Sequence, residues 1–168
     1  ISMLPSQWPA RGGYLGDQYD AFKVFDPIKP VPDIVSHIPP ERMARRIEKL
    51  KFADRQFFHR HANRPVAKSA AENSNLESAL RMMSSDQLAA FDVSNASLSE
   101  RLKFGDTAFG RSCLSAIRLI TAGVRCIEIT LNGWDTHANN HALQAAQIDI
   151  LDPAFATLIA ELKQRDLL

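Results

Sequence analysis

One short run of residues, Val124 to Leu131, limits what this 168-residue chain can fold into more than any other. It reads VRCIEITL, is rich in apolar and β-branched side chains, and has a glycine close to each end, which is typical of a buried β-strand. Helical patterns lie on both sides of it, and a lone strand cannot form a sheet. The sequence therefore predicts a helix-rich α/β fold with few strands, whose partner strands come from the N-terminal residues or from outside this chain.

The rest of the chain divides into three predicted segments. Residues 1–39 are rich in Pro, Gly and Tyr and are expected to form an ordered, mostly extended arm. Residues 40–105 are expected to form a helical subdomain, and residues 106–168 a helix-strand-loop-helix unit. The apolar side chains expected to pin the arm to a neighbouring surface are Tyr14, Leu15, Tyr19, Phe22, Val24 and Phe25.

Apolar periodicity and capping residues predict the helices. They are expected over about 40–62, 66–83, 97–104, 106–123 and 142–168, with a short helix in SSDQLAAFDVS capped by Ser84 or Ser85. Pro39 and Pro40 suit a first helical turn, where the N–H that proline lacks would be unpaired anyway. Pro153 is expected to kink or restart the last helix near Leu151 or Asp152.

Composition narrows the class of protein. A hydrophobic fraction of 45% and a charged fraction of 23% are ordinary for a globular domain with its own core. No apolar run approaches the roughly 20 residues that cross a bilayer, so no membrane span is expected, and the N-terminus shows no signal peptide. A net charge of +1 gives no support for nucleic-acid binding, and we expect none.

Charge is nevertheless unevenly distributed. Residues 41–64 carry eight Lys or Arg and three acidic residues, a local net charge of +5, so the remainder of the chain is negative. A solvated helix face is the favoured interpretation, and a phosphate-binding or membrane-surface role is the alternative.

Neither cysteine nor the serine beside one of them is expected to be reactive. Cys113 and Cys126 lie in apolar surroundings, so two buried free thiols are favoured over a disulfide. Gly110 to Leu114 reads GRSCL, which lacks the second glycine of a nucleophile elbow and lies within a predicted helix. Ser112 is therefore not expected to be a nucleophile. Glu128, inside the predicted strand, requires a polar partner if both faces of the strand are covered.

The segment after the strand, NGWDTHANNH (Asn132 to His141), concentrates metal-binding groups. Ligands of open α/β sheets bind beyond the carboxyl ends of the strands, which is where this segment lies. Asp135 offers a hard oxygen ligand, and His137 and His141 offer imidazoles that would align if a helix had already begun. One carboxylate and two imidazoles suit zinc, manganese or iron, with positions left for water and substrate.

A structural interpretation of the same residues competes with the metal site. Asp and Asn are good helix caps, so Asp135 or Asn139 would simply begin the next helix, with Trp134 in the core. His59 and His61 are two residues apart and face different sides of a helix, so no function is expected of them.

Several segments together resemble one family, the "domain of unknown function 1501", often labelled sulfatase-like. GVRCIEITLNGWDTHANN is similar to its xGVRFVxVxxGGWDTHxxN segment. Further resemblance covers nearly the whole chain, in the segments GYLGDQYDAFKVFDP, SSDQLAAFDVS, FGRSCLSAIRLITAG and LDPAFATLIAELKQRDLL.

The resemblance implies part of an alkaline-phosphatase-like wound α/β fold, in a superfamily of exported, metal-dependent phosphatases and sulfatases. It implies that Asp135 and His137 bind a divalent metal ion, with zinc, manganese and calcium not distinguished. His141 would be a third ligand or a nearby base. The substrate would be a small anionic ester, and the residues expected to orient the ligands or contact it are Asn132, Thr136 and Asn139.

Two segments of the family that would complete such a site are missing from this chain: an early strand with a metal-binding Asp, and a later GEFGRTP segment. The chain is therefore expected to be an internal fragment, inactive by itself, of an exported hydrolase in the periplasm or outside the cell. The rival hypothesis is a non-catalytic helical module that docks a protein partner through the basic helix 40–62 and the aromatic arm.

Overall fold

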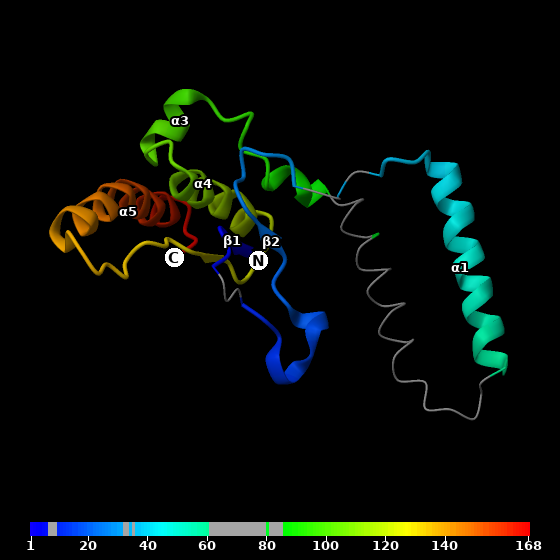
Figure 1. Ribbon diagram of the computed structural model, residues 1–168. Helices are drawn as coiled ribbons and strands as arrows, with labels where there is room; N and C mark the ends of the chain where they lie inside the picture. The colour runs from blue at the N-terminus through cyan, green and yellow to red at the C-terminus, as the bar shows by residue number, and fades with distance from the viewer. Residues whose placement is uncertain (7–9, 32–33, 35, 61–79, 81–85) are drawn as a thin grey trace. The chain divides into compact units, whose positions relative to one another are not determined.

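The computed structural model describes residues 1–6, 10–31, 34, 36–60, 80 and 86–168 (Figure 1). The chain forms two compact units. One unit contains Ile1–Val31 together with Asp86–Leu168, and the other contains Pro32–Ser85. The division into segments 1–39, 40–105 and 106–168 follows the chain rather than these units and stays a prediction.

A small parallel sheet lies at the centre of the first unit. Its strands are β1 (Ser2–Met3), β2 (Lys23–Val24) and β3 (Glu128–Ile129), in the order β2-β1-β3. The N-terminal arm thus supplies β1, the partner of the predicted strand, and β2, the partner of β1, and the helix-rich α/β class is confirmed. Met3 pairs with Val24 on one side and Ile129 on the other, and it is fully buried.

The predicted strand 124–131 is shorter than expected. Only Glu128 and Ile129 are paired, because their partner β1 is itself only two residues long. Glu128 was expected to need a polar partner, and Ser2 is that partner. The Ser2 hydroxyl donates a hydrogen bond of 2.9 Å to the Glu128 carboxylate.

Two helices supply most of the core. α4 (Ala108–Thr121) lies within the helix predicted over 106–123 and begins at Thr107, whose side chain accepts a 3.0 Å hydrogen bond from the Gly110 N–H. α4 packs against α5 (Asn140–Gln164). The buried cluster between and around them contains Val93, Phe104, Phe109, Cys113, Leu114, Ile117 and Ala154.

α5 continues through Pro153, so the predicted restart of the helix is wrong. A proline inside a helix frees the carbonyl of the residue four positions earlier, which here is Asp149. Asp149 is exposed, so water can reach the freed group. The Pro153 ring also lies close to Gly105, within 3.5 Å of where a Cβ would stand at that position.

A shorter helix lies within the range 97–104 that the sequence predicts. α3 (Leu98–Lys103) begins at Ser97, whose hydroxyl accepts from the Glu100 N–H at 3.1 Å. The SSDQLAAFDVS segment forms a 3-10 helix, η3 (Asp86–Ala90), and its predicted caps Ser84 and Ser85 lie outside the described residues. Two further 3-10 helices, η1 (Gly13–Leu15) and η2 (Asp17–Tyr19), lie in the arm.

The arm is held by fewer side chains than predicted. Val24 is buried, and Phe22 meets the Phe91 ring edge-on with 5.6 Å between ring centroids. Asp26 adds an ion pair with Arg111 of α4 at 2.8 Å. The other four predicted anchors are exposed: Tyr14, Leu15 and Tyr19, which lie in the two 3-10 turns, and Phe25, which follows β2.

Of the two thiols, Cys113 is buried and free as predicted, whereas Cys126 is exposed. The prediction of burial for Cys126 is wrong because β3 begins only at Glu128, so Cys126 lies in the irregular stretch before the strand. Its carbonyl accepts a hydrogen bond from the N-terminal amino group of Ile1 at 3.1 Å.

The described part of the second unit is dominated by α1 (Pro40–Arg60). Pro40 is the first helical residue, and the Pro39 carbonyl accepts from the N–H groups of Arg42 and Met43, as predicted. The predicted helix 66–83 and His61 lie outside the described residues, apart from helical Leu80. No helix in the described part of the chain is long and apolar enough to cross a membrane.

Candidate functional site

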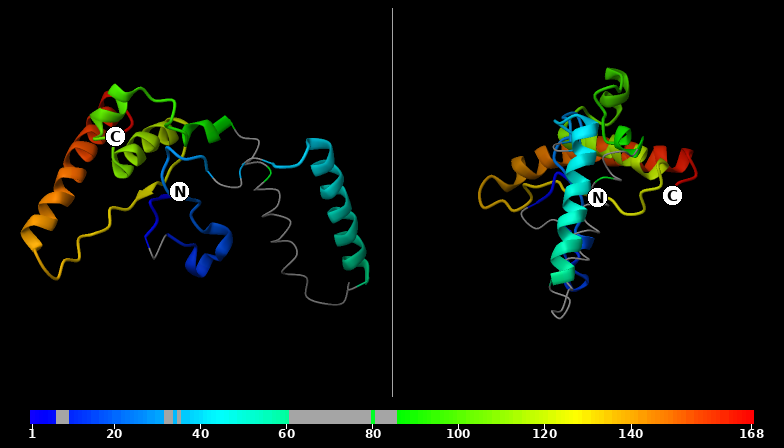
Figure 2. Two further views of the ribbon diagram at one scale, coloured as in Figure 1. Left: turned by 45° about the horizontal axis from the view of Figure 1, so that its top comes forward. Right: turned by 90° about the vertical axis from the view of Figure 1, so that its right-hand side faces the viewer.

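The loop between β3 and α5 carries every candidate ligand. It leaves the edge of the sheet where the three parallel strands end, and runs beside α5 to the first turn of that helix (Figure 1 and Figure 2). Gly133 has φ of +101°, a backbone conformation that favours glycine. The predicted sharp turn out of the strand therefore lies at this residue.

Two glutamines of α5 hold the loop in place. The Gln144 amide donates a 2.8 Å hydrogen bond to the Trp134 carbonyl. The Gln147 side chain lies so close to Gly133 that a Cβ there would stand 2.7 Å from its Nε2 atom. Sequence reasoning missed both glutamines, although their spacing of three places them on one face of the helix that follows the loop.

Asp135 and His137 lie next to each other. Asp135 Oδ1 and His137 Nδ1 are 3.5 Å apart, and the two side chains are 92% and 85% exposed. An oxygen donor and an imidazole nitrogen are thus adjacent and open to solvent at the carboxyl edge of the sheet. Such an arrangement can offer two donors to one ion without rearranging the backbone.

His141 and His137 are not both part of a helix, although their spacing of four residues would align them if they were. α5 begins at Asn140, so His137 precedes the helix while His141 lies in its first turn. The alignment expected of residues four apart within a helix therefore does not apply to this pair. His141 is exposed, and its role stays a prediction.

Asn139 holds the position immediately before α5, but its side chain makes no capping hydrogen bond. Its φ of +51° places it in the left-handed region, which asparagine tolerates better than most residues. Asp135 lies four residues before this position, so it is not the residue that begins the helix. Trp134 is 39% exposed, so it is not a core residue of the described unit.

Thr136 connects the loop to the start of the helix. Its hydroxyl donates a 2.6 Å hydrogen bond to the Asn140 side-chain oxygen, which fixes the residue that separates Asp135 from His137. Asn132, at the start of the loop, is exposed and available to a ligand.

The described residues do not supply a complete set of metal ligands. Within them, no group of three or more His, Cys, Asp or Glu side chains is close enough to hold an ion. Zinc sites in proteins have three or four protein ligands. Asp135 and His137 are therefore compatible with half of such a site.

The residues around GRSCL do not offer a nucleophile. Ser112 is buried, and its hydroxyl donates to the Ala108 carbonyl at 2.9 Å within α4. Burial raises the pKa of the Cys113 thiol to about 12, so it stays protonated at neutral pH. The prediction that this segment is not a nucleophile elbow is confirmed, because it lies inside a helix.

Comparison with known proteins shows a family but no characterised relative. No curated protein and no solved structure matches the chain significantly. The family model described as "Protein of unknown function (DUF1501)" matches residues 4–168, which is nearly the whole chain. The chain therefore belongs to the DUF1501 family of proteins of unknown function.

Proposed function

We propose that this chain contributes Asp135 and His137 as two ligands of a divalent metal centre in a hydrolase of sulfate or phosphate esters. The observation that carries the proposal is the 3.5 Å separation of the two donor atoms on an exposed loop at the carboxyl edge of the sheet. The alkaline-phosphatase-like resemblance of the sequence supplies the reaction class.

The chemistry of the two donors suits the proposed ion. A carboxylate oxygen and an imidazole nitrogen together are acceptable to zinc, manganese or iron, and the carboxylate alone to calcium. A divalent ion supplies Lewis acidity toward ester oxygens. Because two donors do not complete a site, the remaining ligands belong to other residues of the full-length protein, and this chain alone binds metal weakly and turns nothing over.

The neighbouring side chains have supporting roles in this proposal. The hydrogen bond between Thr136 and Asn140 ties the loop between the two ligands to the first residue of α5. Asn132 and Asn139 are exposed and offer amide N–H donors to an anionic ester. In this proposal His141 acts as a third ligand or as a base beside the site. Export from the cytoplasm is part of the same proposal.

Metal titration by calorimetry on the full-length protein tests the ligands. Asp135→Ala combined with His137→Ala is expected to lower the number of bound zinc or manganese ions by one. The matched control is Asp17→Ala with His37→Ala, which removes the same two chemical groups from exposed positions elsewhere. If the number of bound ions is the same in wild type and in the Asp135/His137 variant, the assignment fails.

The second candidate function is docking of a protein partner through the arm. It is favoured by the exposure of large side chains of the two 3-10 turns, since Tyr14 and Tyr19 are 105% and 61% exposed. Aromatic residues, tyrosine among them, are enriched in protein interfaces. Hydroxyl-radical footprinting of the full-length protein, alone and in its native extract, tests this function. Docking protects both tyrosines in the extract, and equal modification in the two samples excludes it.

A further inference from the structure

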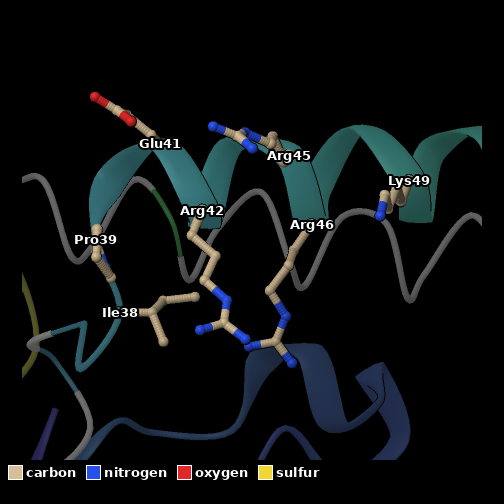
Figure 3. Close-up of a pocket in the computed structure, with 7 residues that line it drawn as sticks. All are labelled: Ile38, Pro39, Glu41, Arg42, Arg45, Arg46 and Lys49. Carbon is tan, nitrogen blue, oxygen red and sulfur yellow. The ribbon is translucent and has the colours of Figure 1, made fainter.

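α1 carries four cations at neighbouring positions in its first half. Arg42, Arg45, Arg46 and Lys49 follow the three- and four-residue spacing of neighbours on a helix, and all are exposed. In Figure 3 the guanidinium groups of Arg42 and Arg46 extend to the same side of the helix, while the side chains of Arg45 and Glu41 extend to the other side. Among the described residues, no acidic side chain forms an ion pair with any of these four. These four residues form the basic face of α1.

Apolar side chains accompany these cations along the helix. Ile38 lies beside the basic face and lines a hollow of about 670 Å³ with its arginines. Phe52, which is 58% exposed, lines a second hollow together with three cations and one acidic residue: Lys49, Lys51, Arg55 and Glu48. Leu50 is also exposed. Cations and exposed apolar groups therefore alternate along a helix of 21 residues, which spans roughly 30 Å.

We propose that α1 binds an anionic lipid surface, lying along it rather than crossing it. The basic face contacts the headgroups, and Leu50 and Phe52 enter the boundary with the acyl chains. A helix that is polar on average, rich in Lys and Arg, and supplied with Phe and Leu on part of its circumference is typical of interfacial helices. Charge complementarity with acidic headgroups supplies the attraction that exposed cations need.

Two other polyanions fit these observations less well. Duplex nucleic acid would neutralise the arginines but leave Leu50 and Phe52 in water. An acidic protein would form ion pairs with a few cations at fixed positions. Here the cations that line the two hollows are instead distributed along the helix from Arg42 to Arg55. A lipid surface satisfies the charges and the apolar groups together.

Co-sedimentation of the full-length protein with vesicles tests the proposal. Vesicles of phosphatidylcholine with 30% phosphatidylserine (roughly the acidic content that gives an attractive surface potential) are expected to bind it, and pure phosphatidylcholine vesicles are not. Binding should be lost near 1 M salt, where the screening length falls to about 3 Å.

The variant Arg42→Gln/Arg46→Gln/Lys49→Gln tests the basic face. Its affinity for the acidic vesicles is expected to fall about fivefold per charge removed, on the order of 100-fold in all. Glutamine has a helix propensity close to that of Arg and Lys, so α1 should persist, and circular dichroism checks this. The control Arg11→Gln/Arg125→Gln/Lys163→Gln removes the same charge from exposed positions in the other unit and should change affinity less than threefold (the scatter expected of about half a kcal/mol).

A second variant, Phe52→Ser, tests the apolar contribution. It should weaken vesicle binding several-fold while leaving its salt dependence unchanged. Three results would overturn the proposal: no binding of wild type to acidic vesicles, equal loss in the control variant, or binding to duplex DNA but not to vesicles. The last result would assign the basic face to nucleic acid instead.

Discussion

At the scale of single residues, the ion pair between Asp26 and Arg111 joins the arm to the core helix. Arg111 donates from Nε and Nη2 to the two carboxylate oxygens of Asp26, at 3.1 and 2.8 Å, and also from Nη1 to Asp106 at 3.1 Å. These hydrogen bonds, led by the side-chain bond from Arg111, hold the pKa of Asp26 below its ordinary value of 3.8. Both side chains are largely buried, so the pair is shielded from solvent.

This geometry predicts the effect of Asp26→Asn on stability. The substitution should lower the free energy of unfolding by about 1.5–3 kcal/mol at pH 7, the usual range for a hydrogen bond to a charged group. Because the folded-state pKa of Asp26 is depressed, its contribution is present above pH 3.8 and is lost as the pH falls through the lowered value. Urea unfolding of wild type and variant should therefore converge at acidic pH. The exposed Asp149→Asn is the control, and a pH-independent difference would contradict the assignment.

The two thiols give a second prediction at this scale. Reactivity belongs to the thiolate, and burial raises the pKa of Cys113 to about 12, while Cys126 is exposed. A thiol reagent at pH 8 should label one cysteine in the native chain and two in denaturant. Cys126→Ser should abolish the native labelling, and Cys113→Ser should leave it unchanged. Rapid native labelling of both thiols would show that Cys113 is accessible.

The residues of the candidate site could be predicted from the sequence, but their arrangement could be predicted only in part. The composition of NGWDTHANNH singled out Asp135, His137 and His141 as candidate ligands, and the family resemblance favoured the first two, whose donor atoms lie 3.5 Å apart in the structure. The alignment expected of His137 with His141 depended on where α5 begins, and that start at Asn140 is set by the left-handed Asn139. Asn139 was one of the two residues expected to begin the helix, but its left-handed backbone conformation has no signature in side-chain spacing.

At the scale of elements, helices were predictable because their signals are local. The helices predicted over 97–104 and 106–123 are α3 and α4, and Ser97 and Thr107 each accept a hydrogen bond from the N–H group three residues later. β1 and β2 could not be predicted, since two residues are too few to show the alternation of a strand. Their existence depends on pairing with residues more than 20 positions away, as Ser2 pairs with both Lys23 and Glu128.

At Gly110, near the start of α4, we expect alanine to be less favourable than glycine, which is the reverse of their usual helix propensities. Gly110 lies within the helix, where alanine is usually better by about 1 kcal/mol. A Cβ at Gly110 would clash with the carbonyl oxygen of Phe104, which approaches the first turn of α4. Gly110→Ala should therefore destabilise the chain by about 1–3 kcal/mol, as overpacking does.

Thermal and urea unfolding of Gly110→Ala measure this effect. The comparison variant is Ala145→Gly at an exposed position of α5, where glycine should cost about 1 kcal/mol. The two variants change the same pair of residues in opposite directions, and both should destabilise. A Gly110→Ala variant as stable as wild type would show that the Phe104 carbonyl moves aside at little cost.

At the scale of the whole molecule, the first unit depends on contacts between the two ends of the sequence. β1 is the central strand, and it pairs with β3 about 125 residues later, where the loop carrying Asp135 begins. The position of the candidate site is therefore set by residues at the N-terminus. Local patterns do not reveal a pairing of this separation, which is why the sequence predicted the strand that contains β3 but not the strands β1 and β2.

Met3 is the residue that makes this dependence testable. It is fully buried between Val24 and Ile129, so Met3→Ala removes most of a buried side chain from the centre of the sheet. The free energy of unfolding should fall by about 2–5 kcal/mol. Leu15→Ala, at a side chain that is 68% exposed, should change it by less than about 0.5 kcal/mol.

Met3→Ala also distinguishes the role of the sheet, which positions the loop, from the role of the two proposed ligands. Under conditions where Met3→Ala remains folded, it leaves Asp135 and His137 intact but loosens the strand from which their loop departs. Metal affinity of the full-length protein should then fall, while the number of bound ions stays the same, in contrast to the loss of an ion expected for the ligand variant. Unchanged affinity in a destabilised Met3→Ala protein would mean that Gln144 and Gln147 of α5, rather than the sheet, hold the loop in place.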